Sequence, residues 1–210
     1  MRKPRLLVLA LVGLVGPLAA PAAAQEHQWT SDRPDGVAPV GIIADRTLAA
    51  GALEVGYRFS NMDAEGIKSG PDRFSEAQVL GIFDFVPVSR SIDTHVLTLG
   101  YGLNDDVTVM ANLGWISKRR ETASQEAFVI QETSDIADAK VDVLWDVWER
   151  GPYRAHVQLG AVVPLGSVEE TGFFPDNSEA PLPYDMQIGT GSWALVPGAV
   201  AATQNENGTV

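Results

Sequence analysis

The chain has 210 residues, carries 15 Lys and Arg against 27 Asp and Glu, and has a formal net charge of −12 at pH 7. This charge argues against binding to nucleic acid, or to anionic phospholipid, through a basic surface. No cysteine is present, so disulfide bonds do not stabilise the fold. The length suits one domain. After residue 24 no apolar run is long enough for a membrane helix, so any membrane span would have to be a strand of a closed barrel.

Residues 1–24 have the pattern of a secretory signal peptide. Arg2, Lys3 and Arg5 form a basic start, residues 6–18 an apolar core, and residues 22–24 a small-residue cleavage site. We therefore expect the mature chain to begin near Gln25 and to be exported.

Residues 25–48 are predicted to form an extended N-terminal lead-in or plug. Residues 33–36 (Arg-Pro-Asp-Gly) are typical of a turn, and Pro39 and Gly41 disfavour regular structure. The first strand is predicted at residues 52–60, where apolar and polar side chains alternate. Its apolar parity is Leu53, Val55, Tyr57 and Phe59, and its polar parity is Glu54, Gly56, Arg58 and Ser60.

A long polar connection is expected over residues 61–92, with a short capped helical turn at 75–80. Two strands follow at 94–102 and 107–115, joined by a tight turn at 103–106. Their outward parity is His95, Leu97, Leu99, Tyr101, Val107, Val109, Ala111, Leu113 and Trp115.

A second long polar connection is predicted over residues 117–134, followed by a hairpin over 138–163 with its turn at 149–152. One parity of the hairpin is apolar and the other is rich in charge. The apolar parity is Ala139, Val141, Val143, Trp145, Val147, Tyr153, Ala155, Val157, Leu159, Ala161 and Val163. Each strand has roughly ten residues, about the length that a tilted strand needs to cross a membrane.

A third long connection follows Pro164, and a sixth strand is predicted to begin near Gln187 and to continue past Ala199. Its outward parity is Trp193, Leu195, Pro197 and Ala199. Residues 205–208 have the composition of a short turn, and residues 209–210 are predicted to open a seventh strand. We therefore expect the sequence to be a fragment of a longer protein.

The predicted connections alternate between long and short, as in bacterial outer-membrane barrels, where turns are short on one side and loops long on the other. We therefore expect an all-β fold: an antiparallel transmembrane β-barrel in the cell outer membrane, with about six strands in this chain. Residues 49–210 would be the truncated N-terminal part of that barrel. A soluble sandwich with one wet face is the alternative.

The polar parity supplies the candidate site, a set of side chains predicted to line a pore. The candidates are Glu54, Arg58, Asp138, Lys140, Asp142, Asp146, Arg154, His156 and Gln158. They could tune the selectivity of the pore, or they could pair across the barrel interior and hold it closed. The sequence shows no catalytic motif, and we expect no enzyme activity, no cofactor and no metal site.

The mature segment resembles a family of outer-membrane transporter barrels of the phenol meta-degradation pathway type. The similarity rests on RPDG at 33–36 with PVG at 39–41, GALEVGYR at 51–58, PLGS at 164–167, and PYDMQIGTGSW at 183–193 leading to Pro197 and Gly198. The resemblance implies a barrel with a transport role. Relatives carry His and Met where this chain has Val37, Ala44 and Leu48, so a metal role is not carried over.

From these patterns and the resemblance we expect an outer-membrane channel or transporter for small compounds, such as hydrophobic or aromatic ones. Its expected partners are outer-membrane lipid and lipopolysaccharide, the barrel-assembly machinery and a small-molecule solute, with no nucleic acid. Two alternatives stay open. One is a non-conducting structural barrel filled by residues 25–48, and the other is a soluble secreted β-sheet protein that binds an apolar ligand.

Overall fold

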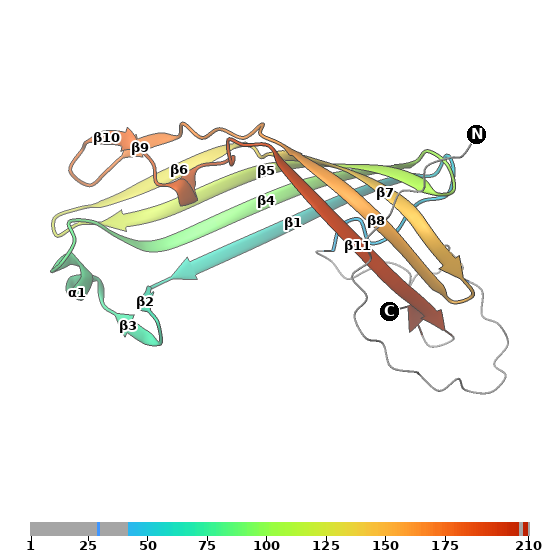
Figure 1. Ribbon diagram of the computed structural model, residues 1–210. Coiled ribbons are helices and arrows are strands. Elements are labelled where there is room, and N and C mark those ends of the chain that lie inside the picture. Colours follow the sequence, from blue (N-terminus) through green and yellow to red (C-terminus); the bar gives the residue numbers. More distant parts are fainter. Residues whose placement is uncertain (1–28, 30–41, 206–207, 210) are drawn as a thin grey trace, which may run out of the picture.

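The computed structural model describes residue 29, residues 42–205 and residues 208–209, which form an antiparallel β-structure with little helix (Figure 1). The predicted signal peptide lies outside these residues, as do most of residues 25–48. The strands of the main sheet are β1 (Leu53–Glu65), β4 (Val86–Gly102), β5 (Val107–Ala123), β6 (Phe128–Ile136), β7 (Ala139–Arg150), β8 (Tyr153–Val163), β11 (Ala194–Asn205) and β12 (Gly208–Thr209). The all-β part of the prediction is therefore confirmed.

The main sheet has the order β1-β4-β5-β7-β8-β11-β12, with β6 also paired to β5. Strand β5 is long enough to hold two partners end to end: β7 pairs with residues 107–112 and β6 with residues 115–123. Strands β7, β8 and β11 run across the direction of β1, so the sheet is strongly twisted (Figure 1). Among the described residues, no strand pairs with the second edge of β1.

Smaller elements lie in the connections at one end of the sheet, which we call the loop end. They are β2 (Ile67–Ser69), β3 (Asp72–Phe74), α1 (Glu76–Leu80), β9 (Thr171–Phe173), β10 (Glu179–Pro181) and the 3-10 helix η2 (Tyr184–Met186). The opposite end, the turn end, carries the short connections at 103–106 and 151–152. Helix α1 confirms the predicted helical turn, because Ser75 and Gln78 form a reciprocal capping box.

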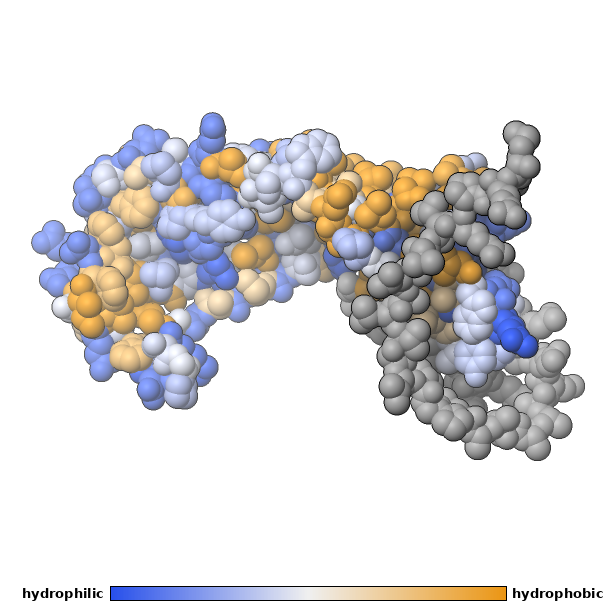
Figure 2. Space-filling model, in the orientation of Figure 1, coloured by the Kyte–Doolittle hydropathy of each residue, from blue (hydrophilic) through white to orange (hydrophobic). Residues whose placement is uncertain are grey.

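The two faces of the main sheet reverse the usual distribution of side chains. The apolar parity, which we call the outer face, is exposed, with Leu53 at 71%, Trp145 at 57% and Leu195 at 73%. The polar parity, the inner face, is covered and includes buried Thr108 and Asp142. Water-soluble folds normally bury the apolar face of a sheet, so this arrangement requires a specific explanation. Figure 2 shows hydrophobic residues gathered on the sheet toward the turn end and hydrophilic residues around much of the loop end.

The inner face contacts a segment that precedes β1. Ala44, Met110 and Leu144 form a small buried cluster, against which Ile43 packs. This cluster lies on the otherwise polar side of the sheet.

The predicted polar connection at 117–134 is wrong. Strand β5 continues to Ala123, and a turn at residues 124–127 leads directly into β6. From Ser117 to Thr122 both parities of β5 are polar, so the alternation that marks a strand disappears from the sequence. Cross-strand contacts stabilise this extension, including a hydrogen bond of 2.8 Å between the hydroxyls of Ser117 and Ser134 and an ion pair between Arg119 and Glu132.

Two other boundaries differ from the prediction. The connection expected over 61–92 is shorter, because β1 extends to Glu65 and β4 begins at Val86. The sixth strand, β11, begins at Ala194 instead of near Gln187, because residues 182–189 fold over the inner face. The expected opening of a seventh strand is confirmed for Thr209, which pairs with Gln204; Val210 lies outside the described residues.

Candidate functional site

The inner face is the candidate site, and the segment 42–50 covers its turn end. The Thr47 hydroxyl donates to Oδ2 of Asp146 at 2.7 Å, and the backbone N–H of Leu48 donates to the Thr108 hydroxyl at 2.7 Å. Nε2 of His156 donates to the carbonyl oxygen of Ala44 at 3.0 Å. These bonds join a segment without regular structure to three strands, β5, β7 and β8.

Ion pairs occupy the middle of the inner face. Arg46 of the covering segment pairs with Glu54 at 2.7 Å, and Lys140 pairs with Asp142 at 2.8 Å. The carboxylate of Asp142 is fully buried, and the ammonium of Lys140 compensates its charge. A buried carboxylate of this kind is stable only with its partner in place.

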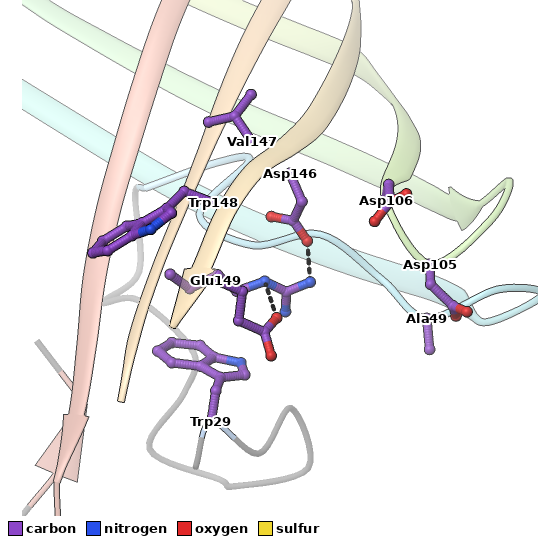
Figure 3. Close-up of a pocket in the computed structure, with 9 residues that line it drawn as sticks. Trp29, Ala49, Asp105, Asp106, Asp146, Val147, Trp148 and Glu149 are labelled. Carbon is purple, nitrogen blue, oxygen red and sulfur yellow. Dashed lines mark hydrogen bonds and ion pairs between the residues drawn. The ribbon is translucent and has the colours of Figure 1, made fainter. Parts of the chain in front are cut away.

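A cavity of about 410 Å³ lies at the turn end of the inner face (Figure 3). It is lined by Trp29, Ala49, Asp105, Asp106, Asp146, Val147, Trp148, Glu149 and Arg154. The guanidinium of Arg154 pairs with Asp146 and, at 3.6 Å, with Glu149, and it lies 5.9 Å from the ring centroid of Trp29. The cavity lining therefore holds four carboxylates and one cation, and the turn end of the inner face is acidic.

The loop end of the inner face is basic. Arg90, Lys118 and Arg120 face the single carboxylate of Asp185, which is part of η2. Burial lowers the pKa of Lys118 and of Arg120; Asp185 opposes the shift and Arg90 adds to it. Positive charge thus lies at one end of the inner face and negative charge at the other.

The predicted pore-lining residues take several different environments. The structure brings Asp146, Arg154 and His156 together around the segment 42–50 at the turn end. Lys140 and Asp142 pair with each other, and Gln158 lies beside Gly198 of the next strand. Glu54 is paired with Arg46, and Arg58 lies on the same parity, four residue pairs closer to the loop end.

Asp138 has an anchoring role that the prediction did not include. It sits in the break between β6 and β7, where its carboxylate accepts hydrogen bonds from the backbone N–H groups of Gly166 and Thr190, both at 2.9 Å. The Thr190 hydroxyl donates to the same carboxylate at 2.6 Å. Asp138 therefore ties both ends of the connection 164–193 to the sheet.

Sequence reasoning missed the basic cluster because it placed Arg90, Lys118 and Arg120 in loops. Lys118, Arg120 and Thr122 continue the inner parity of β5 beyond Trp115, but the outer parity is polar there too, so alternation did not mark these residues as part of a strand. The contact with Asp185 joins residues 95 positions apart and has no local signature.

No protein-family model, curated protein or solved structure matches this chain. In the described part of the chain, no helix combines the length and apolar character needed to cross a membrane. Residues 29, 42–205 and 208–209 also contain no group of three or more His, Cys, Asp and Glu side chains placed to hold a metal ion. The class that the fold defines is an antiparallel β-sheet protein with an apolar outer face and a charged inner face.

Proposed function

We propose that this chain contributes strands to an outer-membrane β-barrel channel for small solutes. The observation that carries the proposal is the outer face, which has no Asp, Glu, Lys or Arg between the level of Trp145 and that of Trp115. On strand β5 this band spans eight residue steps, from Val107 at the level of Trp145 to Trp115, about 26 Å along the strand. At a tilt of about 40° this length gives an apolar band about 20 Å high, close to the roughly 25 Å found in outer-membrane barrels.

Aromatic side chains at both edges of the band support a bilayer as the partner of the outer face. Trp145, Trp148 and Tyr153 lie at the turn end, where the last two stack with ring centroids 6.2 Å apart. Phe59 and Trp115 lie at the loop end of the band, on either side of His95. Tyrosine and tryptophan favour membrane interfaces, because one part of each ring is apolar and the other forms hydrogen bonds.

Beyond the band, at its loop end, charged side chains return to the outer face. There Arg119 pairs with Glu132, and Asn61 donates to Asp93 at 2.9 Å. Membrane insertion would account for this change from apolar to charged side chains, because the extensions of β1, β4, β5 and β6 would then stand in water beyond the lipid. Outer-membrane lipid and lipopolysaccharide would surround the band, and the barrel-assembly machinery would insert it.

The absence of cysteine allows a direct test, because a single introduced thiol is the only one in the chain. Leu113→Cys lies within the proposed band, and Arg119→Cys is on the same parity of β5 beyond it. On intact cells, a membrane-impermeant maleimide should label Arg119→Cys and leave Leu113→Cys unmodified until the protein is denatured. Equal labelling of the two variants in the folded protein would contradict insertion and support a soluble secreted protein that binds an apolar ligand.

Conduction requires a separate measurement. The purified full-length barrel that contains this chain should give discrete conductance steps in a planar lipid bilayer. A protein that inserts, as shown by protection of Leu113→Cys, but gives no steps would be a non-conducting barrel. The contacts of the segment 42–50 with Asp146, Thr108 and His156 favour that second candidate function.

A further inference from the structure

We propose that Arg90 and Arg120, with Lys118 beside them, form a binding site for a small organic carboxylate, and that Asp185 is its internal occupant. The proposal deepens the channel hypothesis and rests on it, because it names the class of solute that would meet the inner face at its loop end. The solute class follows from charge, geometry and the shape of a neighbouring recess.

The two arginines are direct cross-strand partners in the β4–β5 pair. Like charges directly opposite each other destabilise a sheet unless an anion lies between them. Here the anion is Asp185: Arg90 donates to its Oδ2 at 3.1 Å and Arg120 donates to its Oδ1 at 3.4 Å. Each guanidinium thus binds one oxygen of the same carboxylate, which is the arrangement that a bound carboxylate solute would adopt.

The cluster keeps an excess of positive charge. Three cations face one carboxylate, and the remaining contacts of the cluster are with neutral groups. Lys118 Nζ donates to the carbonyl oxygens of Asp185 and Gln187 at 2.9 and 2.5 Å, and Arg120 donates to Oε1 of Gln131 at 2.6 and 3.0 Å.

The nearest acidic side chains on the same strands do not cancel this charge. Glu65 and Glu121 both oppose Ser89 and belong to the outer parity. The lowered pKa of Lys118 and of Arg120 is consistent with cations that burial has left only partly compensated.

A recess of about 190 Å³ opens beside the two arginines. It is lined by Ala64, Gly66, Pro87, Val88, Ser89, Arg90, Arg120 and Asp185. Its volume is below the roughly 300–1,000 Å³ of sites for drug-sized ligands, so it suits a small molecule. Ala64, Pro87 and Val88 give its lining apolar surface, which favours an anion with an apolar body over a purely polar one. Arg90 and Asp185 are one-third and two-fifths exposed, so the solute can reach them.

Isothermal titration calorimetry of the purified full chain in detergent micelles, with benzoate as the probe, tests the site. Asp185→Asn removes the internal competitor and keeps the shape of the side chain, so benzoate should bind at least about tenfold more tightly than to the wild type, a change of about 1.4 kcal/mol. Arg90→Gln, at a partly exposed position, should weaken binding by a similar factor. Arg119→Gln is the matched control, because this arginine lies on the outer face of β5, the strand that pairs with the strand of Arg90, and it forms an ion pair with Glu132. It should leave benzoate binding unchanged.

Three results would overturn the site. Asp185→Asn could bind benzoate no better than the wild type, Arg119→Gln could lose as much affinity as Arg90→Gln, or inorganic phosphate could bind Asp185→Asn more tightly than benzoate. Circular dichroism of each variant checks that its sheet is intact. Binding in micelles does not depend on insertion or conduction, so failure of this site and failure of the channel proposal are distinguishable.

Discussion

Gly102 allows the segment 42–50 to lie directly on the end of β4. A Cβ atom at this position would be 2.1 Å from the carbonyl oxygen of Ala49 and 2.8 Å from that of Leu48. Both obstacles are backbone atoms, so rotation of a side chain cannot relieve the clash.

Gly102→Ala should therefore displace the segment and lower the free energy of unfolding by about 1–3 kcal/mol, the usual range for overpacking. Urea denaturation followed by tryptophan fluorescence measures this change. Gly56→Ala is the control, since its Cβ would be 3.5 Å from that of Thr98, an ordinary contact. If Gly56→Ala lost as much stability as Gly102→Ala, the loss would come from replacing a glycine in a strand and not from the close approach of the segment 42–50.

Strand β5 is the element that divides the molecule into two zones. Up to Trp115 its outer side chains are apolar, and beyond Trp115 they are polar or charged. The change coincides with the change of partner from β7 to β6. The break between these two strands, at Ala137 and Asp138, is also where the connection 164–193 attaches to the sheet.

Asp138→Ala should release that connection, because three donors on Gly166 and Thr190 would lose their acceptor. We expect a loss of about 1–3 kcal/mol in the free energy of unfolding, and faster cleavage within residues 164–193 by a protease. Asp135→Ala is the comparison, because the Asp135 carboxylate accepts only from the N–H of Ile136, its neighbour in the chain. Equal cleavage rates for Asp138→Ala and Asp135→Ala would contradict the anchoring role of Asp138.

Sequence patterns predict some strands of this sheet and miss parts of others. Alternation of apolar and polar side chains predicted the strands around 53–60, 94–102, 107–115 and 138–163, because one face of each has a single character. It failed for the extension of β5, because there both faces are polar and cross-strand pairs such as Arg119 with Glu132 supply the stability. The length of a strand beyond the apolar band therefore could not be predicted from the alternation of apolar and polar side chains.

At the scale of the whole molecule, two segments cover the inner face. Residues 42–50 cover its turn end, and residues 182–189, with Met186 fully buried, cover part of its loop end. Between them lie the ion pairs of Arg46 with Glu54 and of Lys140 with Asp142. In a barrel, both segments would lie inside the lumen and restrict it.

Deletion of residues 25–48 should raise the conductance of the protein in a planar bilayer severalfold, because it removes most of the segment that binds Asp146, Thr108 and His156. Single-channel recording compares the deletion with the full chain. A conductance that does not change on deletion would mean that this segment does not obstruct the path of the solute. Heat modifiability on gels serves as the control that the deleted protein still folds.

The sequence by itself determined the class of the fold, because side chains alternate with period two in every strand that has one apolar face. It also determined which charged residues share a parity, so that Lys140, Asp142, Asp146, Arg154 and His156 were assigned to one face before any contact was known. Only the tertiary structure decided their partners. Arg46, Thr47 and Asp185 reach the sheet from connections without periodicity, and Asp185 meets Arg90 across 95 residues of sequence. Such contacts depend on how the connections fold over the sheet, and local sequence does not encode that path.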